Sequence, residues 1–176
     1  LEMSIMQLFK EQGYTYISGD QIHRERTEVL LADDLKQYLY SRYAKDGITP
    51  SEVESIVLML RNTSGTLYEA NKAIYKMLCD GFIFNREDRT QKDIFIELID
   101  FENPENNIFK AVNQFEIIGI DNQMRIPDGI VFVNGIPVVV LEFKSAVKEN
   151  TTIMDAYTQL TVRYRRYILE IFKLYL

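Results

Sequence analysis

The chain has 176 residues, 47% hydrophobic and 26% charged, the composition of a soluble globular protein, with no apolar run of membrane-helix length. Its formal net charge of −6 argues against strong autonomous binding to nucleic acid, which depends on cationic groups. One cysteine, Cys79, excludes an intrachain disulfide, and with one histidine, His23, it also excludes a cysteine–histidine metal site.

The first segments of the chain show apolar residues at helical spacing. They predict a short helix over residues 4–12, which Gly13 closes. Residues 14–17 then form a short extended segment. Apolar residues over 27–44 again recur at helical spacing and predict a longer helix.

Two further helices have clear end signals. Thr49 and Glu52 stand at capping-box spacing and begin a helix over residues 50–61. Another helix starts near Ser64 or Thr66 and runs to residue 80, where Gly81 is well placed to end it. The first half of the chain is therefore predicted to be helical.

The pattern changes to strands after this point. Residues 93–101 and 114–118 are each rich in β-branched and aromatic side chains, which favour strands. A turn at 121–122 leads to the most apolar stretch, residues 126–145, which predicts two strands joined by a turn. A last helix is expected from residue 151 or 152 to about 172.

This order predicts a mixed α/β fold, a central mixed sheet flanked by helices. Strands that are apolar on both faces must be covered on both sides. We divide the chain into a helical part, residues 1–81, and a sheet with its following helix, residues 82–176, within one compact domain. The first residue is not methionine, so we expect a fragment of a larger chain whose core is truncated at the C-terminus.

Three charged residues interrupt the apolar strand pair: Asp128 entering the first strand, and Glu142 and Lys144 leaving the second. Glu142 and Lys144 are two positions apart, so they share one face of the strand, about 6.6 Å apart. Charges in an apolar strand are costly to bury unless they are paired or bound to metal. This pattern indicates a functional site, although an exposed ion pair of little energetic worth explains an acid and a lysine at this spacing equally well.

The chemistry of these residues suits hydrolysis of a phosphodiester. Asp128 and Glu142 can hold Mg²⁺ through oxygen, with the backbone carbonyl of Phe143 as a third ligand. Lys144 can orient or deprotonate the attacking water and stabilise the developing charge.

The geometry of the turn constrains this site. If Asn134-Gly135 were a plain two-residue turn, Asp128 would lie opposite Leu141 and on the wrong face from Glu142. We therefore expect that the Asn-Gly signal misleads, and that a three- or five-residue loop or a β-bulge places Asp128 opposite Glu142.

The pattern Pro127-Asp128…Glu142-Phe143-Lys144 resembles the PD-(D/E)xK nuclease signature. The flanking sequence resembles more narrowly the N-terminal nuclease domain of the restriction (R) subunit of type I restriction–modification enzymes. The segments that carry this resemblance are residues 100–107, 112–115, 134–138 and 142–145.

The resemblance implies a restriction-endonuclease-like core. It also implies Mg²⁺-dependent cleavage of double-stranded DNA in the prokaryotic cytoplasm, with Asp128, Glu142 and Lys144 as the catalytic set. It implies an ATP-driven motor in the full R subunit, and specificity and methylation subunits as partners. This chain has no P-loop, so ATP is not expected to bind here.

The family also carries a glutamine–tyrosine motif on the helix after the lysine, and Gln159 matches its glutamine as a further catalytic residue. The usual spacing is Gln-x-x-x-Tyr, whereas Tyr164 here is five residues on, with Arg163 at the expected place. On an α-helix this turns the tyrosine away from the glutamine by roughly 140° instead of 40°.

Arg163, Tyr164, Arg165 and Arg166 form a basic–aromatic cluster that suits phosphate contact, although a solvated helix face or a contact with the motor domains fits it as well. Two other functions stay open at this point. One is another PD-(D/E)xK nuclease of DNA repair or of a mobile element. The other is a catalytically silent domain that docks a motor or methyltransferase assembly.

Overall fold

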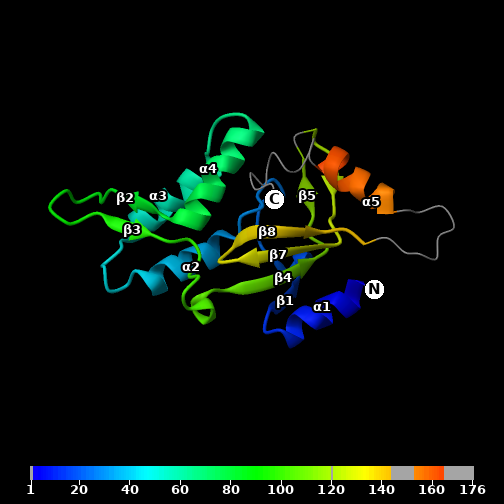
Figure 1. Cartoon of the computed structure of the whole chain (residues 1–176), viewed down its shortest axis with the longest axis horizontal. Coiled ribbons are helices and arrows are strands. Elements are labelled where there is room, and N and C mark those ends of the chain that lie inside the picture. Colours follow the sequence, from blue (N-terminus) through cyan, green and yellow to red (C-terminus); the bar gives the residue numbers. More distant parts are fainter. Residues whose placement is uncertain (1, 120, 144–152, 165–176) are drawn as a thin grey trace. The chain divides into compact units, whose positions relative to one another are not determined.

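The computed structural model describes residues 2–119, 121–143 and 153–164 (Figure 1). It is a mixed α/β protein, as predicted. The chain forms two compact units whose ranges interleave along the sequence. We call them the sheet unit, Leu1–Val29, Phe109–Phe132 and Pro137–Leu176, and the helical unit, Leu30–Ile108 and Val133–Ile136.

A four-stranded sheet in the order β1-β4-β7-β8 forms the centre of the sheet unit. β1 and β4 are parallel, with Thr15 paired to Lys110. β7 and β8 are neighbours joined by two residues, a connection that only an antiparallel pair allows, so the sheet is mixed. The strands are β1 (Thr15–Ser18), β4 (Phe109–Asn113), β7 (Gly129–Val133) and β8 (Ile136–Leu141).

The remaining elements of the sheet unit lie around these strands. They are α1 (Glu2–Glu11), the 3-10 turn η1 (Gly19–Gln21), the hairpin β5 (Ile117–Ile118) with β6 (Met124–Arg125), α5 (Ile153–Thr158) and the π-helical η3 (Gln159–Tyr164). All of β7 is buried, which its apolar sequence predicts. Phe132 packs against Phe115, with ring centroids 5.5 Å apart, in the core of this unit.

The helical unit contains three helices followed by a small hairpin. These elements are α2 (Ala32–Arg42), α3 (Pro50–Arg61), α4 (Leu67–Asp80), β2 (Phe82–Phe84), β3 (Ile94–Ile96) and the 3-10 turn η2 (Pro104–Asn106). Both α3 and α4 begin with a complete capping box, from Thr49 to Glu52 and from Thr66 to Glu69. No helix among the described residues is both long and apolar enough to cross a membrane.

Three predicted elements differ from the structure. The helix expected from residue 27 begins only at Ala32, because the Leu31 N–H is bonded to the Gly135 carbonyl and holds the preceding segment out of helix. The strand expected over 93–101 is limited to Ile94–Ile96. The strand expected over 114–118 is interrupted because Gln114 has φ of +50°, a left-handed conformation that ends β4.

A buried ion pair joins α3 to the segment after β2. Arg86 donates from Nε to Glu52 Oε1 at 2.7 Å, and the two side chains are 3% and 1% exposed. The Arg86 guanidinium also donates to the carbonyls of Asp46 and Gly47, both at 2.9 Å. All of these groups lie in the helical unit, so the pair fixes the β2–β3 hairpin to its helices.

Candidate active site

The turn between β7 and β8 has two residues, so the expectation of a longer loop was wrong. Asn134 and Gly135 have φ of +50° and +76°, the left-handed pair that a tight hairpin turn requires. The Asn-Gly signal in the sequence therefore reports the local structure faithfully.

The strands nevertheless do not keep the register that this turn would impose. In a regular pair Gly129 faces Val140, and Leu141 points to the opposite face of the sheet. A Cβ added to Gly129 would lie 3.5 Å from the Leu141 Cβ and 3.2 Å from its Cδ1, so both positions share a face. A β-bulge in β8 would account for this contact, and the expected pairing of Asp128 with Glu142 stays a prediction.

Asp128 lies next to the end of β8. The Phe143 N–H donates to the Asp128 carboxylate, with 2.5 Å between N and Oδ2. Asp128, Glu142 and Phe143 are all half-buried, and the residue on either side of Asp128, Pro127 and Gly129, is buried. The two strand ends thus meet at the two acids named from the sequence.

Helix α1 supports this corner of the sheet. Met6 is 1% exposed, and a Cβ on Gly129 would come within 2.6 Å of its Cε atom. A larger residue at position 129, next to Asp128, would therefore have to displace the end of the Met6 side chain. Sequence reasoning assigned no role to Met6, because a single apolar residue on a short helix carries no signal of its partner.

The donor atoms at this corner suit a hard divalent cation. Two carboxylates and the Phe143 backbone carbonyl supply oxygen, and Mg²⁺ commonly completes its shell with water. No group of three or more histidine, cysteine, aspartate or glutamate side chains with metal-site geometry occurs in the described ranges. The predicted set has only two such side chains, and its third ligand is a backbone carbonyl. The assignment of Asp128, Glu142 and Phe143 as ligands therefore stays a prediction.

The other predicted site residues are described in part or not at all. Lys144, Arg165 and Arg166 lie outside the described residues. Gln159 is half-buried at the start of η3, and only the backbone of Arg163 and Tyr164 is described.

The backbone changes the expected relation between Gln159 and Tyr164. The angle of roughly 140° assumes an α-helix, whereas Gln159–Tyr164 is π-helical. Hydrogen bonds in a π-helix join residues five apart, so positions 159 and 164 lie one turn apart, as positions four apart do in an α-helix. The glutamine–tyrosine spacing is one residue longer here than is usual in the family, and the wider turn of the π-helix compensates for that extra residue.

The segment 100–107, which carries much of the family resemblance, forms a buried polar network. Asp100 is 1% exposed and accepts from Arg42 Nη1 at 2.6 Å and from Asn106 Nδ2 at 2.8 Å. The Asn106 hydrogen bond, together with others from Asn103 and with the nearby Arg42 charge, lowers the pKa of Asp100 although burial opposes this. These residues hold structure and do not form a second acidic site.

Hydrogen bonds of the same network also fix the turn between β7 and β8. Asn134 is fully buried, and its Oδ1 accepts from the Ile108 N–H at 2.7 Å. Its Nδ2 donates to the Leu98 carbonyl and to Asn107 Oδ1, both at 2.8 Å. The turn that starts β8 is therefore fixed by side-chain bonds as well as by its own backbone.

Asn134→Ala is expected to destabilise the protein by about 3 kcal/mol, measured by urea denaturation. It leaves the half-buried Ile108 N–H without the Asn134 side-chain acceptor and places alanine at a positive φ. Asn122→Ala is the matched control, because Asn122 has φ of +57° but lies exposed in a turn. A loss of stability as small as that of Asn122→Ala would show that the side-chain hydrogen bonds of Asn134 contribute little to stability.

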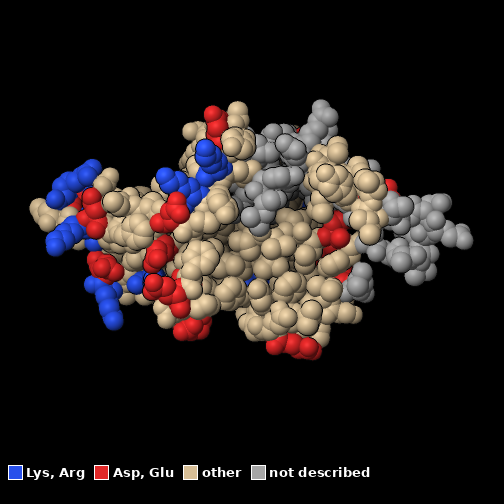
Figure 2. Space-filling view, in the orientation of Figure 1, with Lys and Arg blue, Asp and Glu red and all other residues tan. Residues whose placement is uncertain are grey.

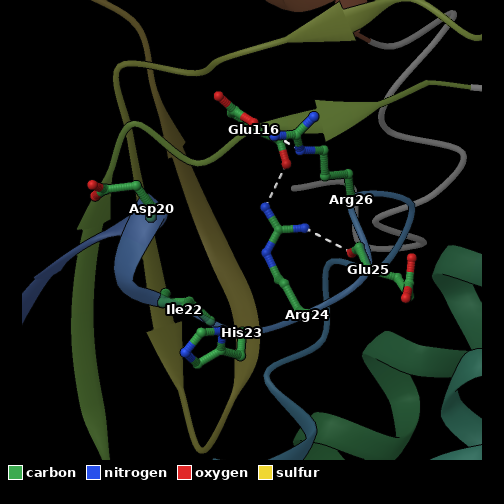
Figure 3. A pocket seen from close by; sticks show the side chains of 8 residues that line it. Asp20, Ile22, His23, Arg24, Glu25, Arg26 and Glu116 are labelled. Atoms are coloured by element: carbon green, nitrogen blue, oxygen red, sulfur yellow. Dashed lines mark hydrogen bonds and ion pairs between the residues drawn. The ribbon is translucent and has the colours of Figure 1, made fainter.

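A second candidate is a cavity of about 460 Å³ in the sheet unit (Figure 3). Its residues are Gly19, Asp20, Ile22, His23, Arg24, Glu25, Arg26 and Glu116.

The two arginines of this cavity are bonded to other groups of the protein. The Arg24 guanidinium donates to the carbonyls of Glu25, Glu28 and Glu116, and lies 3.4 Å from the centroid of the Phe115 ring. Burial lowers the pKa of Arg24 to about 10. Arg26 is paired with Glu116 at 2.8 Å (Figure 3). The cavity therefore presents a structural arginine, and we assign no ligand to it.

Comparison with known proteins gives one family. The family model described as the N terminus of the type I restriction enzyme R protein matches residues 1–175. The "Type I restriction enzyme HindI endonuclease subunit" of Haemophilus influenzae is 31% identical over 98% of this chain and 17% of its own length. The "Putative type I restriction enzyme MjaIXP endonuclease subunit" of Methanocaldococcus jannaschii is 34% identical over 89% of this chain and 16% of its own. The chain thus spans about one sixth of the length of these relatives.

Proposed function

The chain belongs to the family of type I restriction enzyme R protein N-terminal regions, and on this premise we propose that it is the domain that cuts double-stranded DNA in such an enzyme. The observation that supports the proposal most directly is the hydrogen bond from the Phe143 N–H to Asp128. It joins the two strand ends that carry the acids of the nuclease signature. The relatives that match are named as endonuclease subunits.

We assign the metal to the two acids. Asp128, Glu142 and the Phe143 carbonyl would hold Mg²⁺, which when bound polarises the phosphodiester and makes a water molecule more acidic. Asp128 has one carboxylate oxygen, Oδ2, directed at the Phe143 N–H, and this bond holds the carboxylate in place. The protein therefore orients its ligand before the metal arrives.

Two further residues complete the proposed reaction. Lys144 stands two positions after Glu142 in the sequence. As a neutral amine its side chain would orient the attacking water and take its proton, and the ammonium group so formed would offset the charge that develops on the phosphate. Gln159, one turn from position 164 along η3, is assigned to positioning. Arg163, Tyr164, Arg165 and Arg166 are proposed to contact the DNA backbone.

The rest of the enzyme is assigned to other parts and subunits. Because the chain covers about one sixth of its relatives, we place the ATP-driven motor in the remainder of the R subunit. Target recognition and methylation belong in this proposal to the specificity and methylation subunits, and the complex acts in the prokaryotic cytoplasm.

Asp128→Asn is expected to weaken binding of Mn²⁺ about 100-fold, measured by isothermal titration calorimetry. The amide removes the charge of a direct ligand but keeps an oxygen that accepts from the Phe143 N–H, so the fold is retained. Asp33→Asn, an identical change at an exposed acid in the first turn of α2, is the control and leaves binding unchanged. Equal binding by the wild type and Asp128→Asn would contradict the metal assignment.

A further inference from the structure

Segment 100–107 of the helical unit forms a loop whose base is closed by side-chain bonds. The Asp100 N–H donates to Asn107 Oδ1 at 2.9 Å, and Asn107 Nδ2 donates back to the Asp100 carbonyl at 2.8 Å. The segment has the form of an Ω-loop, a compact surface loop of about 6–16 residues whose ends lie close together. The nuclease proposal gives this loop no role beyond structure.

Further bonds fix the interior of the loop. Asp100 Oδ1 accepts from the Asn103 N–H at 3.0 Å, and Asp100 Oδ2 accepts from Asn106 Nδ2 at 2.8 Å. Pro104 begins the 3-10 turn η2, and its carbonyl accepts from the N–H and from Nδ2 of Asn107, both at 3.0 Å. The loop is therefore held in one conformation by its own bonds, so it loses little conformational entropy when it binds a partner.

This rigid loop presents an aromatic side chain to solvent. Phe101 is 62% exposed, directly after Asp100, which is 1% exposed. Single exposed apolar residues are common on protein surfaces and by themselves indicate nothing. Phe101 differs because the loop that carries it is fixed by side-chain bonds. Aromatic residues of this kind are typical of the anchors that carry most of the binding energy of a protein interface.

Two acids follow the aromatic residue on the same loop. Glu102 and Glu105 are exposed, and among the residues that the structure describes neither takes part in an ion pair. In Figure 2, acidic side chains lie over the short coil of η2, just before β4. A cavity of about 510 Å³ lies beside the loop, and its lining includes Glu105 and, from the segment after α2, Lys45.

Acids outnumber cations on the loop and around this cavity. Arg42 is bonded to Glu97 at 2.7 Å and to Asp100 at 2.6 Å. The four acids are Glu97, Asp100, Glu102 and Glu105, and the two cations are Arg42 and Lys45. This surface is therefore a poor site for the phosphates of nucleic acid. It suits a protein surface on which lysine or arginine stands next to an apolar pocket.

The size of the surface decides between a separate partner and another part of the same polypeptide. A buried phenylalanine contributes about 150–250 Å², whereas a stable interface between separate proteins buries about 800 Å² on each partner. A covalent link supplies an effective concentration in the millimolar range, at which a small contact is sufficient. In the two relatives, about five sixths of the polypeptide lies outside the region that matches this chain.

We propose that the loop of residues 100–107 docks onto the remainder of the R protein, with Phe101 in an apolar pocket and Glu102 and Glu105 beside lysine or arginine. The contact fixes the N-terminal region against the rest of the polypeptide. This proposal rests on the family to which the chain belongs, and it makes no use of the metal assignment.

A photochemical crosslink identifies the occupant. The photoreactive residue p-benzoylphenylalanine replaces Phe101 in the full-length R protein, and mass spectrometry after irradiation identifies the crosslinked peptide. We expect a crosslink within the same polypeptide, to a segment outside the matched region. The same residue in place of Tyr68, which is 74% exposed on α4 of the same unit, is the control and is expected not to reach that segment.

The crosslink is repeated in the complete restriction complex with DNA. Crosslinks from position 101 only to the methylation or specificity subunits, only to DNA, or to no other segment would overturn the proposal. Equal crosslinking of the same segment from positions 101 and 68 would also overturn it.

Hydrogen exchange tests the charges of the loop in the full-length R protein. Glu102→Lys/Glu105→Lys replaces two attractions with repulsions, so amides 101–106 are expected to exchange about tenfold faster, relative to their intrinsic rates. Glu11→Lys/Asp80→Lys makes the same change in net charge at the exposed last residues of α1 and α4, and it is expected to leave exchange in the loop unchanged.

Equal exchange in the wild type and in Glu102→Lys/Glu105→Lys would overturn the proposal, as would an equal increase in Glu11→Lys/Asp80→Lys. Thermal unfolding establishes that each variant is folded. Failure here leaves the metal titration of Asp128→Asn unaffected, so the two proposals fail separately.

Discussion

Lys144→Ala in the complete restriction complex is expected to reduce DNA cleavage about 1000-fold or more, while ATP hydrolysis and DNA binding continue. The proposed ammonium group acts on the attacking water and on the phosphate, and it takes no part in binding nucleotide. Cleavage of a plasmid that carries the recognition sequence measures the first activity, and phosphate release from ATP measures the second.

A second substitution separates the two roles assigned to this lysine. Lys144→Arg keeps the positive charge but cannot give up a proton near neutral pH. Retained cleavage in this variant would assign the residue to charge stabilisation alone, whereas lost cleavage supports its action on water. Lys148→Ala, in the same segment, serves as the control. Normal cleavage by Lys144→Ala would refute the site.

Glu52→Gln is expected to destabilise the protein by about 3–5 kcal/mol, because it leaves the buried Arg86 guanidinium without its countercharge. Glu54→Gln is the matched control on the same helix. Glu54 pairs with Lys36 at the surface, where the side chains are 45% and 30% exposed, and such a pair contributes at most about 1 kcal/mol. Urea denaturation of both variants measures the difference. Equal losses of unfolding free energy in the two variants would show that the buried pair stabilises the protein no more than the surface pair.

The buried pair of Glu52 and Arg86 also predicts that the stability of the protein depends on pH. Burial raises the pKa of Glu52, but hydrogen bonds from Arg86 and from the Thr49 and Glu87 N–H groups outweigh it and lower the pKa below 4.5. A lowered pKa in the folded state contributes stability that is present above the unfolded value and lost as pH falls through the folded value. The difference between wild type and Glu52→Gln should therefore narrow as pH decreases below about 4.5.

Local signals predicted local structure well. The capping box at Thr49 predicted one helix start correctly, because it is complete within four residues. The next helix was expected from Ser64 or Thr66, and the structure shows a capping box at Thr66. The Asn134-Gly135 sequence also predicted the two-residue turn, and the expectation that this signal misleads was wrong. The close approach of Gly129 and Leu141 depends on how two strands pack, which a two-residue signal cannot report.

Long-range features could not be obtained from the sequence. β2 has three residues, too few for a periodic pattern, so the hairpin with β3 was missed. Segment 100–107 was seen as a family resemblance, but its bonds to Arg42 and Asn134 appear only in three dimensions. The Phe143 N–H, next to Glu142 in the chain, donates to Asp128, while the shared metal site of Asp128 and Glu142 stays a prediction.

The parallel pairing of β1 with β4 has a consequence for how the chain folds during synthesis. Thr15 pairs with Lys110, 95 positions later, and most of the helical unit lies between them. At about 5–20 residues per second, the ribosome needs about 5–20 s to deliver the second strand. The helices and the hairpin of the helical unit depend largely on nearby contacts and can form in that interval. We therefore expect β1 to remain an unpaired edge in the nascent chain until β4 emerges, and the candidate site at Asp128 to be among the last features to assemble.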